Sequence, residues 1–410
     1  MIVVRWSLLL AAVLLVVDAV FGNAPVASQV DDFTLQDHLG AKHSLREWRD
    51  KRAVVVVFLG TECPLAKLYG SRLAEMAAEY KPRGVAFVGI DSNQQDSLLE
   101  IGHYARVHKI DFPLLKDSAG KVADQFGATR TPEAFVLDGD GHVLYHGRID
   151  DQFGVGYQRQ NEVQRDLDNA IDEILAGQPV TTPVTEPVGC YISRAKEKQP
   201  TGDITYTNQI ARLVDKHCVR CHRPGQIAPF TLTSYDDVSA WAETMCEVMD
   251  DSRMPPWHAN PKYGHFANDA HMPSDEKQLF HQWVDNGMPE GDAADLPEPT
   301  RYAEGWQIPE PDVVFCMPQP FTVPAKGTVP YQYFWLDKTF DEDVWIRGAE
   351  VRPGNPAVVH HIFLFFMPPG QDEIHAEDPL FNSIATFAPG MPAALSRCES
   401  WLRARPRPSA

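Results

Sequence analysis

Residues 54–76 are "VVVVFLGTECPLAKLYGSRLAEM", and in this stretch one hydrophobic pattern gives way to another at a cysteine. The run 54–59 is continuously apolar, which predicts a β-strand buried on both faces. After Pro64 the apolar residues take helical spacing, and proline suits the first turn of a helix. Cys63 is therefore expected at the start of a helix, where the amide dipoles stabilise a thiolate.

The same alternation of strand and helix continues on both sides of this stretch. A second apolar run, 85–91, is followed by helical spacing over 94–109, and 128–147 predicts a loop, a strand and a hairpin. Alternating strands and helices indicate a sheet covered by helices. We expect an α/β domain over residues 27–178.

These residues resemble the thioredoxin-fold redoxins of the alkyl hydroperoxide reductase and thiol-specific antioxidant type. The resemblance implies a catalytic Cys63 and a cis bond before Pro132, which would lie against that cysteine. Ala66 occupies the place of the second cysteine of a CxxC pair, which excludes a thioredoxin-style local disulfide. The alternative is that Cys63 is an inert buried cysteine.

A further cysteine follows the expected α/β domain, in "EPVGCYISR", residues 186–194. Cys190 resembles the tail cysteine of peroxiredoxin-like redoxins and could resolve an oxidised Cys63. It falls in a Pro- and Thr-rich stretch, so we expect 179–202 to be a linker.

The next block, 203–292, shows helical spacing over 207–217, 237–249 and 275–287, which predicts an all-α domain. It contains "CVRCH", residues 218–222. A zinc site built from two CxxC pairs would need a second pair, and the other cysteines are isolated. A redox CxxC normally follows a strand. The motif instead matches covalent haem attachment, with Cys218 and Cys221 as thioether anchors and His222 as the iron ligand.

A second iron ligand is expected from "SRMPPWHAN", residues 252–260. Met254 precedes two prolines, which force an extended segment able to present a thioether. Met272 and His258 are the alternatives. With "CVRCH", this segment resembles small class I cytochrome c domains.

The last block, 310–395, has strand-like segments at 329–337, 343–351 and 358–366. It resembles the N-terminal domain of the copper type II, ascorbate-dependent monooxygenases, which implies a partial β-sandwich. There, an adjacent histidine pair, here His360 and His361, holds one copper with a third histidine, and a later domain holds a second copper. Only His375 follows the pair. The arginine-rich residues 396–410 are expected to be an aperiodic tail, either an unpacked extension or a product of truncation or frameshift.

The start of the chain predicts export. An apolar run from Trp6 to Val17 follows Arg5 and is too short to span a bilayer, so residues 1–22 are expected to be a signal peptide. An uncleaved N-terminal anchor is the alternative, and either places the chain in the periplasm. The formal net charge of -19 argues against nucleic-acid binding.

Together the three resemblances suggest an exported bacterial fusion of a redoxin, a cytochrome c domain and a truncated copper monooxygenase domain. We expect an oxidoreductase that combines haem c electron transfer with peroxidase or disulfide reductase chemistry at Cys63. One alternative is a copper monooxygenase fed with electrons by the haem. Another is a non-enzymatic electron carrier. The expected cofactors are haem c and copper, and the expected partners are electron donor or acceptor proteins or small oxidants.

Overall fold

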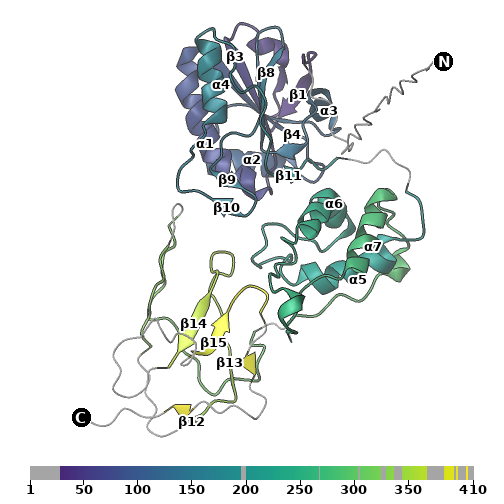
Figure 1. Ribbon diagram of the computed structural model, residues 1–410, viewed down its shortest axis with the longest axis vertical. Coiled ribbons are helices and arrows are strands. Elements are labelled where there is room, and N and C mark those ends of the chain that lie inside the picture. The colour runs from purple at the N-terminus through teal and green to yellow at the C-terminus, as the bar shows by residue number, and fades with distance from the viewer. Residues whose placement is uncertain are drawn as a thin grey trace, which may run out of the picture. The chain divides into compact units, whose positions relative to one another are not determined.

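The computed structural model describes residues 28–194, 200–266, 268–302, 305–324, 329–336, 344–366, 383–391, 394–395 and 403–404. The chain divides into two compact units, residues 1–195 and 196–410 (Figure 1). The expected signal peptide and most of the expected tail lie outside the described residues, as does His375. Among the described residues, no helix has both the length and the apolarity needed to cross a membrane.

The first unit is built on a seven-stranded sheet with strand order β2-β1-β5-β4-β3-β7-β8. Its interior strand β3 pairs in parallel with β4 and antiparallel with β7. The strands are β1 (Thr34–Asp37), β2 (Lys42–Ser44), β3 (Ala53–Leu59), β4 (Val85–Asp91), β5 (Leu114–Lys116), β7 (Glu133–Leu137) and β8 (Val143–Gly147).

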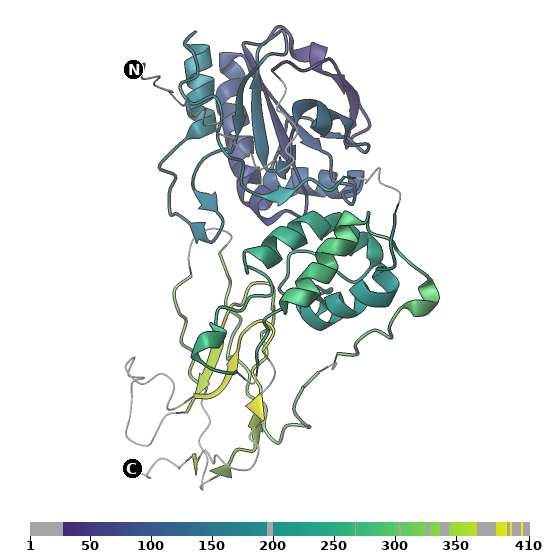
Figure 2. The same cartoon turned by 45° about the vertical axis from the view of Figure 1, so that its right-hand side comes forward.

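Helices cover both faces of this sheet, as Figures 1 and 2 show. One face carries α1 (Pro64–Tyr80), α2 (Leu98–His108) and α4 (Asp166–Leu175), and the other carries α3 (Lys121–Phe126). Val55 and Val57 pack into the first core, whereas Val54 and Val56 pack into the second. Successive strand residues point to opposite faces, so a strand covered on both sides is apolar at every position. The expected thioredoxin-like α/β fold is confirmed.

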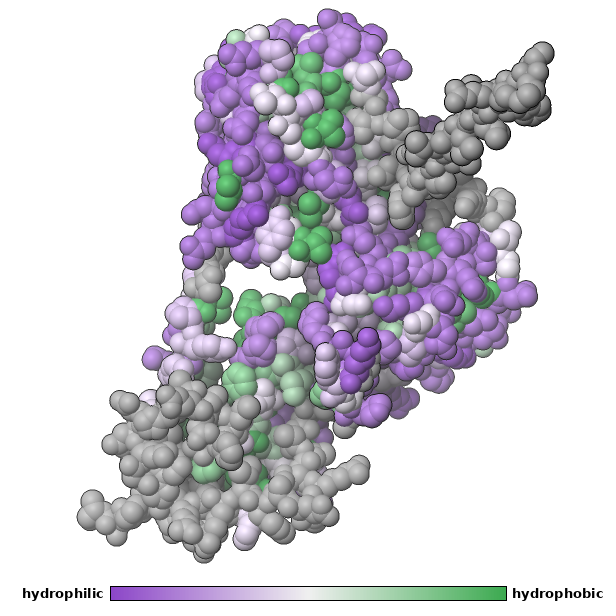
Figure 3. Space-filling model, in the orientation of Figure 1, coloured by the Kyte–Doolittle hydropathy of each residue, from purple (hydrophilic) through white to green (hydrophobic). Residues whose placement is uncertain are grey.

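Short elements complete the first unit. They are the 3-10 helices η1 (Leu45–Trp48) and η2 (Lys81–Arg83) and the two-residue strands β6 (Arg130–Thr131), β9 (Phe153–Gly154), β10 (Tyr157–Gln158) and β11 (Cys190–Tyr191). β9 pairs with β10, and β11 pairs with β6. The face of the first unit seen in Figure 3 is mostly hydrophilic.

The segment 179–202 was expected to be a linker, and its first part is not one. The Thr185 amide donates to the His146 carbonyl at 3.0 Å, and Ile192 is buried at 2% exposure in the second core. Strand β11 then pairs with β6. These contacts extend the first unit as far as Arg194. The segment forms backbone hydrogen bonds with β8 and β6, and its Ile192 side chain packs into the second core.

The second unit begins with helices, as expected for residues 203–292. A continuous winding runs through η3 (Tyr206–Ile210), α5 (Ala211–Val214) and η4 (Asp215–Val219), whose outer parts are π-helical. The longer helices are α6 (Tyr235–Asp250) and α7 (Ser274–Asp285), and the 3-10 turns are η5 (Pro261–Tyr263) and η6 (Ala293–Asp295). Trp283 is fully buried and packs against Tyr206 and Phe280.

The strand-rich end of the chain has three two-stranded ladders among its described residues, rather than one sheet. They pair β12 (Val344–Trp345) with β17 (Arg403–Ala404), β13 (Gly348–Ala349) with β16 (Ala394–Leu395), and β14 (Ile362–Phe365) with β15 (Ser383–Phe387). The strand expected at 329–337 is absent from its described part, 329–336. Tyr331 and Tyr333 there are 75% and 70% exposed. An alternating pattern becomes a strand only where a neighbouring strand supplies the hydrogen bonds.

Candidate functional site

The first candidate site is centred on Cys63, where β3 ends and α1 begins. Cys63 has an extended backbone and occupies the N-cap position of α1, directly before Pro64. Its side chain is 2% exposed and packs with Ala66 in the first core. The loop before it is held by Asp96, whose carboxylate accepts from the Thr61 amide at 2.8 Å. The cysteine is therefore rigidly placed at a helix N-terminus.

The structure brings Cys190 and Pro132 to this cysteine. The Cys63 thiol donates to the Thr131 carbonyl at 2.9 Å, and the Thr131-Pro132 bond is cis. In the β6–β11 ladder Cys190 stands directly opposite Thr131. All the residues of the predicted thiol site therefore lie together.

Close approach of two backbones makes this arrangement possible. A Cβ atom on Gly189 would lie 2.0 Å from the Thr131 carbonyl oxygen, and one on Gly60 would lie 2.4 Å from Nδ2 of Asn93. Real Cβ atoms do not come so close to other atoms. Glycine at position 189 lets β11 approach Thr131 beside the cysteine, and glycine at position 60 leaves room for the Asn93 side chain.

The environment favours the thiolate form of Cys63. Burial alone would raise the pKa of its thiol, but the side chain and backbone of Cys190, the nearby Thr131 side chain and the backbone of Ala66 outweigh that effect. The pKa of Cys63 is lowered to about 6. A thiol with this pKa is largely ionised at neutral pH and is both a competent nucleophile and a good leaving group.

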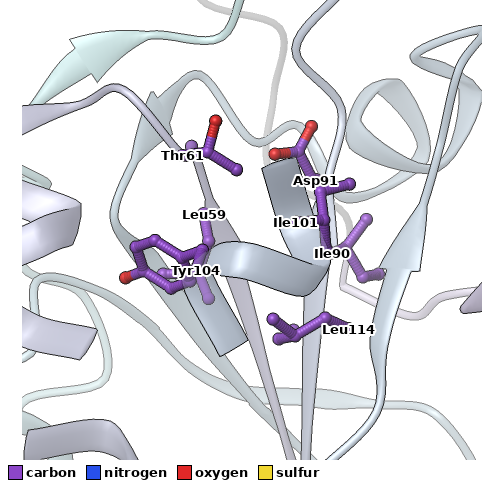
Figure 4. Close-up of a pocket in the computed structure, with 9 residues that line it drawn as sticks. Leu59, Thr61, Ile90, Asp91, Ile101, Tyr104 and Leu114 are labelled. Carbon is purple, nitrogen blue, oxygen red and sulfur yellow. The ribbon is translucent and has the colours of Figure 1, made fainter. Parts of the chain in front are cut away.

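A buried polar network beside the site was not predicted from the sequence. Asp91, 4% exposed, pairs with the Lys116 ammonium at 2.9 Å and lines a small cavity with Thr61 and Tyr104 (Figure 4). Burial and the nearby Asp96 raise the pKa of Asp91 well above its usual range, despite Lys116. The available signal was the polar stretch that ends the second apolar run, 91–96.

Asn93 connects this network to the tail segment. Its side-chain oxygen accepts from the Ser193 amide at 3.1 Å, and the Gln94 amide donates to the Ser193 carbonyl at 3.1 Å. The Asn93 amide nitrogen donates in turn to Asp96. The network therefore fixes the loop before Cys63 and the segment after Cys190 to the same support.

The second candidate site is the "CVRCH" turn at the end of η4. The amides of Cys221 and His222 both donate to the Cys218 carbonyl, at 3.0 and 2.9 Å, so the three side chains lie on one tight turn. Nδ1 of His222 is 3.1 Å from the Phe230 carbonyl. Since a carbonyl only accepts, Nδ1 carries the proton and Nε2 is left available to bind a metal.

The protonation of this turn does not favour a redox-active thiol pair. Burial raises the pKa of Cys218 to about 12, and burial also raises the pKa of Cys221. Redox-active CxxC pairs have a lowered pKa instead. Burial lowers the pKa of His222, which keeps its imidazole neutral, as an iron ligand must be. These residues fit a covalently attached haem.

The candidates for the second iron ligand differ in exposure. Met254 is 42% exposed and precedes a cis bond to Pro255, whereas Met272 is buried at 2%. His258 is exposed. The Met254 side chain is therefore accessible as an iron ligand, whereas Met272 is buried like a core residue.

The histidine pair lies immediately before β14, not within it. His360 and His361 are both exposed, and their Nδ1 atoms are 3.1 Å apart. Adjacent residues can converge in this way because the strand begins only at Ile362. The described residues contain no group of three or more His, Cys, Asp or Glu side chains that could hold a metal ion.

Comparison with known proteins identifies the first unit. Residues 26–146 match the model of the AhpC/TSA family. The thiol-disulfide oxidoreductase ResA of Bacillus thuringiensis subsp. konkukian is 24% identical over 119 residues, which cover 29% of this chain and 67% of ResA. The chloroplastic peroxiredoxin Q of Sedum lineare is 28% identical over 133 residues, covering 31% of this chain and 70% of that protein.

Solved structures are also similar to part of this chain. A hypothetical protein from Sinorhizobium meliloti is 32% identical and covers 42% of this chain and 94% of its own, with a TM-score of 0.39. The peroxidoxin BcpB from Mycobacterium tuberculosis is 26% identical and covers 37% of this chain and 94% of its own, with a TM-score of 0.28.

The lowered pKa of Cys63 gives a first prediction. The rate at which iodoacetamide alkylates Cys63, followed by peptide mass spectrometry, should rise with pH through a midpoint near 6. In Cys190→Ala, which removes the contribution of that side chain, the midpoint should move up towards the ordinary cysteine value of about 8.5. Cys246 in the same samples serves as the internal control. A midpoint that stays in place in Cys190→Ala would contradict the role of the Cys190 side chain.

Proposed function

Because residues 26–146 form a thioredoxin-fold redoxin domain of the AhpC/TSA type, we propose that the chain is a thiol-disulfide oxidoreductase whose redox pair is Cys63 and Cys190. The observation that carries this proposal is that Thr131 brings the two cysteines together, because its carbonyl accepts from the Cys63 thiol at 2.9 Å and Cys190 stands opposite it in the β6–β11 ladder. In the reducing direction, a substrate disulfide is cleaved to two thiols. The electron pair comes from the two cysteines, which form a disulfide with each other.

The arrangement of the pair supports such a cycle. Cys190 is opposite Thr131 in the ladder, and Cys63 donates to Thr131, so both cysteines share one support. A disulfide between the two cysteines would therefore join segments that already meet at Thr131. The dithiol and the disulfide can therefore interconvert without unfolding of the domain.

The lowered pKa of Cys63 also favours a second candidate function, that of a thiol peroxidase. The Cys63 thiolate would attack a hydroperoxide, releasing the alcohol and leaving a sulfenic acid. The Cys190 thiol would then attack that sulfur, forming the same disulfide and releasing water. The two functions share the disulfide product and differ in the oxidant.

Oxidation should therefore link one specific pair of cysteines. We expect full-length protein treated with oxidised glutathione or hydrogen peroxide to give a Cys63–Cys190 peptide pair in non-reducing peptide mapping. Cys63→Ser should lower the disulfide reductase rate by about 100-fold, because the Cys63–Cys190 disulfide that completes the cycle can no longer form. Cys246→Ala is the matched control and should keep full activity. A stable sulfenic acid on Cys63 without the cross-link would contradict the two-cysteine cycle.

Comparison of the two oxidants separates the two functions. Faster oxidation of the reduced pair by glutathione disulfide supports the disulfide reductase. Much faster oxidation by hydrogen peroxide supports the peroxidase.

For the second unit we propose covalent haem c, held by Cys218, Cys221 and His222, with Met254 as the second iron ligand. A bound haem supplies one-electron transfer. The Phe230 carbonyl orients His222 and fixes its tautomer, and one tight turn carries both thiols and the imidazole. We further propose export to the periplasm, on the strength of the apolar N-terminal run, and redox proteins or small oxidants as partners.

Haem attachment can be tested without any activity assay. In protein produced together with a haem-attachment system, haem should remain on the polypeptide after denaturation and organic extraction, because thioether bonds survive both. The double variant Cys218→Ala, Cys221→Ala should release it. Met254→Ala should remove the sulfur-to-iron absorption band of the oxidised protein, and Met272→Ala is its control. Loss of the band in Met272→Ala alone would reassign the ligand.

For the last block we propose weak copper binding at His360 and His361, without monooxygenase activity. The pair supplies two imidazoles, and the described residues add no third ligand. Two imidazoles under-coordinate copper, so exchangeable binding is expected.

Demetallated protein reloaded with copper should hold a single ion at this pair. His360→Ala should lose it, whereas His258→Ala should retain it. The protein should consume no oxygen in the presence of ascorbate and a hydroxylatable substrate. Coupled hydroxylation abolished by His361→Ala would contradict this proposal.

A further inference from the structure

The two cysteines of the redox pair differ in how easily an external molecule can reach them. Cys63 is 2% exposed and belongs to the first core. Cys190 is only half-buried and lies at the margin of the same core. A molecule approaching the disulfide from solvent therefore meets Cys190 before Cys63.

Strand β11 produces this difference, because it occupies the edge of β6 next to Cys63. Its pairing places Cys190 opposite Thr131 and Tyr191 opposite Arg130. The Arg130 guanidinium lies 4.1 Å from the centre of the Tyr191 ring and donates to the Gly189 carbonyl at 2.7 Å. The segment is thus fixed on both sides of Cys190.

The other end of this segment is fixed as well. The Ile192 amide donates to the Thr129 carbonyl at 2.9 Å, and Ser193 is held by Asn93 and Gln94. Residues 189–193 occupy the edge of β6 next to Cys63. An external peptide could pair with this edge, or contact Cys63, only after displacing them. Direct attack on Cys63 therefore carries the cost of breaking several hydrogen bonds, and attack on Cys190 does not.

We propose that Cys190 is the sulfur at which external thiols exchange with this domain, and that Cys63 is the buried sulfur released or engaged behind it. This inference rests on the proposed function of the pair. An external thiolate attacks Cys190 in the Cys63–Cys190 disulfide, forms a mixed disulfide with Cys190 and releases the Cys63 thiolate. A second external thiolate then attacks the external sulfur of the mixed disulfide. This gives an external disulfide and the Cys190 thiolate, which takes up a proton.

The chemistry of the leaving group agrees with this order. Exchange is faster when the departing thiol has a low pKa, and the surroundings of Cys63 stabilise its thiolate. Attack on the accessible sulfur thus expels the better-stabilised thiolate. The order also defines the class of partner, which is a small thiol or a protein thiol on an exposed surface that can reach Cys190 at the margin of the domain.

The test uses oxidised full-length protein and reduced glutathione. The reaction is stopped with acid within the first turnover, the free thiols are alkylated in denaturant, and peptides are mapped by mass spectrometry. We expect glutathione on Cys190 in about tenfold excess over glutathione on Cys63, with the alkyl label on Cys63. Glutathione mainly on Cys63, or an even distribution, would overturn the inference. Starting protein without the Cys63–Cys190 disulfide would instead remove the proposed function, and this inference with it.

A variant that weakens the packing of residues 189–193 over Cys63 provides an independent test. Arg130→Ala removes the ring contact with Tyr191 and the hydrogen bond to Gly189 while leaving both cysteines in place. The share of glutathione on Cys63 should rise about threefold or more over the wild type. Arg106→Ala, an exposed arginine of α2, is the matched control and should keep the wild-type distribution. An unchanged distribution in Arg130→Ala would overturn the role of β11 as the cover.

Discussion

The thiol site depends on a single main-chain element, the short β6 strand that ends at Thr131. Its carbonyl accepts from the Cys63 thiol, and its ladder places Cys190 opposite the same residue. One rigid backbone position thus sets the location of both sulfur atoms. Glycine at position 189 lets β11 lie against the Thr131 carbonyl, and glycine at position 60 leaves room for the Asn93 and Thr131 side chains.

The central features of the first unit could be predicted from local patterns. The apolar run 54–59 forms β3, and each of its residues contacts one of the two cores in turn. Pro64 and Cys63 take the helix-start positions that their chemistry favours. Such features depend on neighbours in the sequence, and a periodic pattern records them directly. The same holds for the helices of the second unit.

Features that depend on distant contacts could not be predicted in this way. The tail 183–194 has the composition of a linker, yet it is held by His146, β6 and Asn93, none of which is near it in sequence. The Asp91–Lys116 pair was missed because each residue alone is unremarkable. At 329–336 the sequence predicted a strand that the structure does not contain. The alternating pattern was visible, but the partner strand that such a pattern needs is not found among the described residues.

The position of β11 at the end of the first unit has a consequence for how this domain can be studied in isolation. A fragment cut at residue 178, where composition suggests a boundary, would keep the whole seven-stranded sheet and α4. It would look complete by every measure of secondary structure. Cys63 would nevertheless stand uncovered and without Cys190, the redox partner that we propose for it, so the fragment would have the reactions of a one-thiol protein. Any excised domain must extend to Arg194 to represent the chemistry of the intact chain.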